Sequence, residues 1–126
     1  TGVQTCALPI FNRVPPAAAS PNNQVERHPH AAQVFLPVGV SRYLVTVMPS
    51  DDGGAPAPDR SLSFLLPGTT GVVYRPGAWH AGITALDSDA SFAVLMWRGA
   101  ADDDVFAPIA PLMLHVVPAA HTGTDR

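Results

Sequence analysis

The sequence predicts an all-β fold, an antiparallel sandwich or barrel of short strands. The 14 prolines among 126 residues leave no uninterrupted stretch long enough for an amphipathic helix of about 12 residues. Apolar runs of strand length recur at intervals of roughly 8–15 residues, and turns containing Pro or Gly separate them. Several of these runs are apolar on both faces, which indicates a two-sheet core or a barrel wall that also meets a dimer partner.

Seven segments have the composition of strands. The clearest is 42–48, in which Tyr43, Val45 and Val47 share one face and the residues between them share the other. The seven predicted strands cover residues 33–38, 42–48, 61–66, 72–74, 80–85, 91–97 and 112–117. The loops between them include a long one over 49–59, and residues 101–110 have room for one short helical turn.

The two ends are expected to lie outside the barrel. Residues 1–10 resemble a translated sequencing adapter, and residues 11–24 have the Pro-, Ala- and Asn-rich composition of a linker. The last residues are small and polar, which is typical of a frayed tail. The predicted organisation is therefore a non-native or linker segment over 1–24, a barrel over 25–118 and a disordered tail over 119–126.

Composition excludes several classes of partner. Seven basic against ten acidic residues give a net charge of −3, so no basic surface is available for nucleic acid. No apolar run has the length of a membrane span, and no signal peptide is recognised, so we expect a cytoplasmic protein with no membrane partner. The sequence has no Gly-rich phosphate loop and no nucleophile with an obvious base, which argues against a nucleotide cofactor and against covalent catalysis.

Two histidine segments point to a metal or small-molecule site. His28 and His30 flank a proline just before a predicted strand; on an extended segment such residues point to the same face, about 7 Å apart. A Pro-Gly turn then delivers His80 at the start of another strand. Neutral imidazoles are ligands for divalent metals, and Gln33 offers a weaker oxygen ligand.

Each of these residues also has an ordinary structural interpretation. His28 and His30 suit a solvated strand edge beside a proline, and His80 suits a core position bonded to a backbone carbonyl. The run Asp102-Asp103-Asp104 has the character of a solvated charged loop.

Two motifs resemble signatures of the ureidoglycolate lyases, formerly called ureidoglycolate hydrolases. The first is Glu26-Arg27-His28-Pro29 followed by Gln33-Val34-Phe35, Pro37 and Gly39, and the second is Gly71-Val72-Val73-Tyr74-Arg75-Pro76-Gly77-Ala78-Trp79-His80. The segments 42–47 and 64–68 between them are similar to the family in order and spacing, so the resemblance runs from about residue 26 to about residue 109.

The resemblance implies a cupin-type double-stranded β-helix, a jelly-roll barrel that is N-terminally truncated here and forms a homodimer. It also implies a carbon–nitrogen (amidine) lyase that cleaves ureidoglycolate to glyoxylate and urea, a late step of purine and allantoin catabolism. The partner is then a small carboxylate substrate.

Site roles follow from the chemistry of these residue types together with the resemblance. A divalent metal, Ni or Mn, would be held by His28, His30, Gln33 and His80. The catalytic candidates are Glu26, His80 and Tyr74, for proton transfer and for donation to a substrate oxygen. Glu26 could also be a metal ligand or only a salt-bridge partner of Arg27. The substrate-binding candidates are Arg27 and Arg75, for the carboxylate, and Trp79.

The chain departs from the family pattern at three positions. Val73 stands where an Asn commonly precedes the Tyr, Ala81 where a second His commonly follows the Trp-His pair, and Trp97 where an Asp commonly precedes Arg-Gly. Each change removes a polar group near the expected site. The alternative function is therefore a cupin that binds a small carboxylate, or a paralogue of different specificity without lyase activity.

Overall fold

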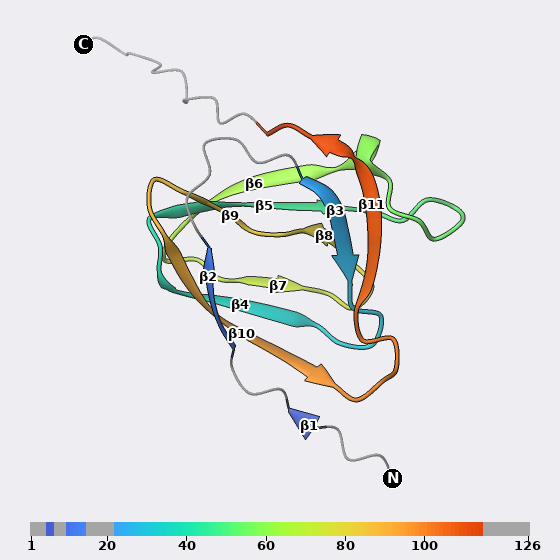
Figure 1. Ribbon diagram of the computed structural model, residues 1–126, viewed down its shortest axis with the longest axis horizontal. Coiled ribbons are helices and arrows are strands. Elements are labelled where there is room, and N and C mark those ends of the chain that lie inside the picture. Colours follow the sequence, from blue (N-terminus) through green and yellow to red (C-terminus); the bar gives the residue numbers. More distant parts are fainter. Residues whose placement is uncertain (1–4, 7–9, 15–21, 115–126) are drawn as a thin grey trace, which may run out of the picture.

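The computed structural model describes residues 5–6, 10–14 and 22–114, which form two antiparallel sheets packed face to face (Figure 1). The strands are β1 (Thr5–Cys6), β2 (Ile10–Val14), β3 (Asn22–Arg27), β4 (Gln33–Gly39), β5 (Arg42–Met48), β6 (Leu62–Pro67), β7 (Val72–Tyr74), β8 (Trp79–Ala81), β9 (Thr84–Leu86), β10 (Ala90–Arg98) and β11 (Val105–Leu112). Among the described residues the only helical element is a single 3-10 turn, η1 (Pro58–Arg60). The predicted all-β fold is confirmed.

The chain crosses repeatedly between the two sheets, as a jelly roll does. One sheet has the order β1-β10-β4-β7, with β2 also paired to β10; the other has the order β11-β3-β8-β5-β6, with β9 also paired to β5. Thus β3 lies in one sheet and β4 in the other, and the same holds for β7 and β8. No helix in the described part of the chain is both long enough and apolar enough to cross a membrane.

Aromatic residues fill the space between the sheets. Phe92 on β10 meets Tyr43 on β5 and Phe35 on β4 in edge-to-face contacts, with ring centroids 4.9 and 6.1 Å apart. A second buried cluster, Val25, Met48, Trp79 and Ala81, lies on the other face of the β3-β8-β5 layer. The indole of Trp79 in that cluster donates to the carbonyl of Gly54 (3.3 Å), in the long loop between β5 and β6.

The structure corrects several predicted boundaries. Residues 10–14 and 22–24, expected in the non-native or linker segment 1–24, form β2 and the start of β3, because their backbones pair with β10 and β11. The predicted strand 80–85 is two strands, β8 and β9, separated by Gly82 and Ile83. The tail 119–126 lies outside the described residues.

The last strand also differs from the prediction. β11 covers residues 105–112, where a loop and a helical turn were expected, and the predicted strand 112–117 shares only Leu112 with it. Residues 115–117 of that prediction lie outside the described part of the chain. The prolines of β11 are tolerated because β11 is at the end of its sheet, and the register with β3 shifts between Pro108 and Leu112.

Gly68 ends the motif at 64–68 for a steric reason. Its N–H donates to the carbonyl of Ser41 (2.9 Å), which draws the turn after β6 against the turn before β5. A Cβ at this position would lie 1.9 Å from the carbonyl oxygen of Val40, a backbone atom that cannot rotate away.

We predict that Gly68→Ala lowers the free energy of unfolding by at least about 2 kcal/mol, because the backbone must shift to relieve the clash. Gly39→Ala is the matched control, since a Cβ there meets nothing within 4 Å. Urea unfolding followed by tryptophan fluorescence measures both variants. Equal midpoints for Gly68→Ala and Gly39→Ala would contradict the close approach.

Candidate metal and acid–base site

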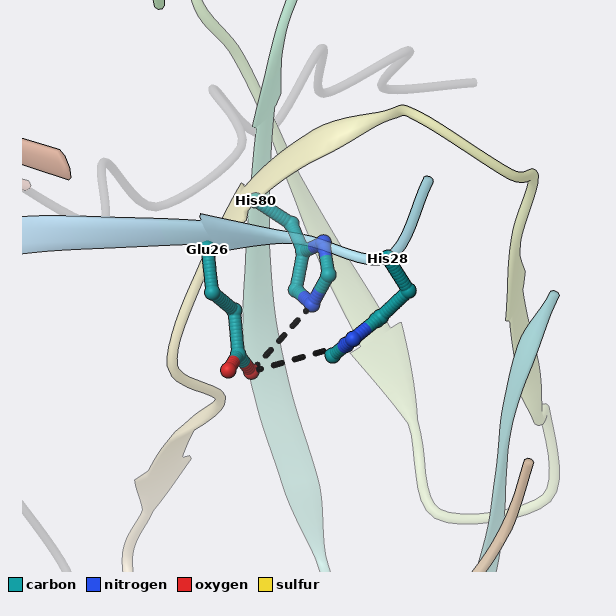
Figure 2. Close-up of side chains that lie close together, drawn as sticks. All are labelled: Glu26, His28 and His80. Carbon is teal, nitrogen blue, oxygen red and sulfur yellow. Dashed lines mark ion pairs between the residues drawn. The ribbon is translucent and has the colours of Figure 1, made fainter. Parts of the chain in front are cut away.

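Three side chains point toward one another: Glu26 from β3, His28 just after β3, and His80 from β8 (Figure 2). A Glu26 carboxylate oxygen lies 3.4 Å from Nε2 of His80 and 4.0 Å from Nε2 of His28. The three potential ligand atoms all lie within 4.8 Å of one another. They can therefore meet a single ion with small side-chain movements.

Strand register places Glu26 and His80 side by side. Glu26 is directly opposite His80 in the β3–β8 pair, so both side chains project from the same face of the sheet. A cavity of about 190 Å³ opens on this face, lined by Gln24, Val25, Glu26, His80, Gly82 and Phe106. Beyond β3 the chain bends, and the N–H of Gly77 donates to the carbonyl of His28 (2.8 Å). This hydrogen bond ties the Pro-Gly turn that precedes His80 to His28, the other histidine of the site.

His80 is surrounded by oxygen acceptors. It is 1 % exposed, and its Nδ1 lies 2.9 Å from the carbonyl of Ala78, so this nitrogen is the donor. Its Nε2 faces Oε1 of Gln33 at 3.1 Å and the carboxylate of Glu26 at 3.4 Å. A lone pair facing two oxygens is unfavourable, and a metal ion bound between them would stabilise the arrangement.

His28 presents the complementary feature. Its Nδ1 donates to the carbonyl of Asp103 (3.1 Å), and a carboxylate oxygen of Asp104 lies 3.0 Å from the same nitrogen. With Nδ1 protonated, Nε2 carries a lone pair, yet it is buried and has no hydrogen-bond partner among the described residues. A buried, unpartnered imidazole nitrogen beside a carboxylate and a second imidazole fits a divalent cation.

The local charges support this assignment. The hydrogen bond with His80 holds the pKa of the Glu26 carboxyl below its usual value of 4.5, against the opposing effect of burial. Glu26 is therefore ionised at neutral pH. Burial, and to a smaller extent the nearby Tyr43 and Glu26, raises the pKa of the Tyr74 hydroxyl, which stays protonated. The Tyr74 ring stacks on His80 with centroids 3.9 Å apart, and its buried hydroxyl has no partner within the described residues.

The structure brings four predicted site residues together: Glu26, His28, Gln33 and His80. It places His30 elsewhere, with a half-exposed ring whose Nε2 contacts the carboxylate of Asp102 at 2.8 Å. The same-face argument for His28 and His30 requires extended backbone, but β3 ends at Arg27 and the chain bends over residues 29–30.

Two predicted substrate contacts lie on the opposite face of the sheet. Arg27 follows Glu26 on β3, and Trp79 precedes His80 on β8. Because side chains alternate along a strand, Arg27 and Trp79 point away from the site. The Arg27 guanidinium lies 4.7 Å from the centre of the Trp79 ring, and both side chains donate to the carbonyl of Gly54 at 3.3 Å. Arg75 is exposed just after β7.

Asp104 is a contact of the site that no sequence pattern indicated. Asp102, Asp103 and Asp104 were expected to form one solvated loop, whereas Asp104 contacts His28 and also accepts two hydrogen bonds from Arg98, at 2.7 and 3.1 Å. Its position just before β11 was the available signal, but no strand was predicted at residues 105–112.

The three departures from the family pattern do not line the site. Ala81 is buried in the apolar cluster around Trp79, and Val73 and Trp97 are 62 % and 51 % exposed. Val73 and Ala81 are strand neighbours of Tyr74 and His80, and so point to the other face of their sheets. The expectation that each change removes a polar group from the site is therefore wrong.

Comparisons with known proteins identify the family of this chain. The chain is 38% identical over 87 residues to the ureidoglycolate lyase of Burkholderia cepacia, an alignment that covers 68% of this chain and 48% of that protein. It is 37% identical over 94 residues to the ureidoglycolate lyase of Azotobacter vinelandii, covering 72% of this chain and 55% of that protein. The chain thus spans about half the length of these curated relatives.

The fold is also similar to that of a solved structure. The Lactobacillus farciminis oxalate decarboxylase structure superposes with a TM-score of 0.55 at 16% identity, covering 81% of this chain and 26% of that one, which supports the cupin-type barrel. The sequence profile described as ureidoglycolate lyase matches residues 2–113, nearly the whole chain and including most of the segment expected to be non-native. The chain belongs to the ureidoglycolate lyase family.

Proposed function

We propose that this protein cleaves ureidoglycolate to glyoxylate and urea. The observation that carries the proposal is the convergence of Glu26, His28 and His80 within 4.8 Å of one another, with Glu26 and His80 lining a cavity, in a chain of this family. Both imidazoles expose Nε2 toward the Glu26 carboxylate, which suits them to hold a metal or to transfer a proton.

We propose Glu26, His28 and His80 as the metal ligands, with Oε1 of Gln33 beside them. Ni²⁺ or Mn²⁺ is the expected ion, because both accept mixed nitrogen and oxygen ligands. When bound, the ion would supply Lewis acidity that lowers the pKa of the substrate hydroxyl.

The protein's own groups supply the proton transfers. Ureidoglycolate carries a hydroxyl, a carboxylate and a urea nitrogen on one carbon. Loss of the hydroxyl proton allows the C–O bond to become a carbonyl while the C–N bond breaks, and its electron pair leaves on the urea nitrogen. The ionised Glu26 carboxylate, through the oxygen that does not hold the ion, accepts the hydroxyl proton and returns it to the urea nitrogen. No water is consumed.

Tyr74 and Arg75 are proposed to bind the substrate. The Tyr74 hydroxyl is protonated, buried and without a described partner, so it can donate to a substrate oxygen. Arg75, exposed in the adjoining turn, is the remaining predicted arginine for the carboxylate.

The protein is also proposed to act as a homodimer in the cytoplasm. Strand β6 lies at the end of its sheet, and its apolar side chains Leu62, Phe64 and Leu65 are each about half exposed or more. Such a surface suits contact with a second copy.

We predict that Glu26→Gln lowers kcat for glyoxylate formation by about 10²- to 10⁴-fold, because the amide cannot accept the proton. His80→Ala should abolish activity because it removes a proposed metal-ligating nitrogen beside Glu26. Glu26→Gln, nearly isosteric and half-buried, still tests the site if His80→Ala fails to fold. His30→Ala is the control, since His30 lies outside the group. Wild-type turnover no faster than the spontaneous reaction would instead favour the carboxylate-binding alternative.

We predict that the wild-type protein, stripped with a chelator and dialysed, binds one Ni²⁺ or Mn²⁺ per chain in isothermal titration calorimetry. His28→Ala removes one of the two imidazole nitrogens and should weaken this binding at least about tenfold. His30→Ala should bind as wild type does. Equal loss in the two variants would place the ion elsewhere.

We predict that Tyr74→Phe lowers kcat without lowering the melting temperature. The hydroxyl has no partner to lose, and removing an unsatisfied buried polar group is worth up to about 1–3 kcal/mol. Tyr43→Phe is the matched control: its hydroxyl donates to the carbonyl of Thr70, so that variant should be less stable by about 1 kcal/mol and normally active. A less stable, fully active Tyr74→Phe protein would show that the hydroxyl is structural.

A further inference from the structure

We propose that Asp104 is a positioning residue for His28: together with the carbonyl of Asp103, it keeps the proton on Nδ1, so that Nε2 presents its lone pair to Glu26 and His80. The inference adds a residue to the proposed function. It rests on that function only for what the Nε2 lone pair of His28 does, which is to bind the metal ion. Asp104 does not itself reach the cavity lining.

The contacts around the buried ring set its orientation. His28 is 3 % exposed, and two oxygens lie at its Nδ1: the carbonyl of Asp103 at 3.1 Å and a carboxylate oxygen of Asp104 at 3.0 Å. An acceptor beside one ring nitrogen determines which tautomer forms, and a carboxylate strengthens this preference because it is charged. The other nitrogen, Nε2, is the one that lies 4.0 Å from Glu26.

The carboxylate is itself held in place. Arg98, at the end of β10, donates two hydrogen bonds to Asp104, so both carboxylate oxygens are engaged before β11 begins. Asp103 accepts a hydrogen bond from the N–H of Gly99 (2.7 Å), which closes the same loop. The β10–β11 loop therefore presents a preorganised pair of oxygens to an imidazole that is far away in sequence.

The tautomer matters because the two forms of a neutral imidazole expose opposite nitrogens. With a proton on Nε2, His28 could donate to Glu26 but could not ligate an ion at that atom. Partners of this kind commonly contribute 10- to 100-fold to metal affinity in proteins. Asp104 is thus expected to act through His28, without touching the substrate.

Long-range ¹H–¹⁵N NMR of the metal-free protein at pH 8 tests the tautomer directly. We expect the Nδ1–H form of His28 in the wild type and a clear gain of the Nε2–H form in Asp104→Leu. Asp104→Asn, which keeps an acceptor oxygen, should largely retain the wild-type form and serves as the rescue variant. A wild-type tautomer in Asp104→Leu would overturn the proposal, because the Asp103 carbonyl would then suffice alone.

Calorimetry with Ni²⁺ and Mn²⁺ gives the second readout. Asp104→Leu should weaken binding about 10- to 100-fold. Asp102→Asn is the matched control from the same loop: it alters the contact with the exposed His30 and should change neither the tautomer nor the affinity. An equal loss in Asp102→Asn would assign the effect to general loop disorder and overturn the proposal. If the wild-type protein binds no ion, the proposed metal site fails, while the NMR result still decides the role of Asp104.

Discussion

The pairing of β3 with β8 is the constraint on which the site depends. It sets Glu26 opposite His80, and because side chains alternate along each strand, the same register sends Arg27 and Trp79 to the other face. One face of this strand pair carries Glu26 and His80, the groups proposed for acid–base chemistry. The other carries an apolar cluster sealed by the loop that contains Gly54. A one-residue slip would exchange the two faces, so the packing of Trp79 and the orientation of His80 depend on the same register.

The buried polar atoms of the site are unevenly supplied with hydrogen-bond partners. His80 has acceptors at both nitrogens, whereas Nε2 of His28 and the hydroxyl of Tyr74 have no partners among the described residues. Buried polar atoms are normally paired, and these two unpaired atoms are the basis on which we propose that a cation and a substrate complete the network. The surrounding contacts, from Asp103, Asp104 and Ala78, hold the rings in position.

Much of the fold was predictable from local patterns. The alternation in 42–48 and the turns at Pro67-Gly68 and Pro76-Gly77 depend on neighbouring residues only, and the structure has strands and turns there. β3 and β11 were not recognised as strands because their composition is that of a linker and a Pro-containing loop. They are strands because each pairs with the other, which is a long-range interaction.

The sequence by itself determined the fold class, the family, and the candidates Glu26, His28 and His80, because motif spacing and strand periodicity are local properties. Only the tertiary structure decided which candidates meet. It separated His30 from His28 by ending β3, turned Arg27 and Trp79 away from the site, and brought in Asp104 from a loop 76 positions further along the chain than His28. The physical reason is that strand pairing and chain bends set the direction of each side chain, and neither is encoded by the residue alone.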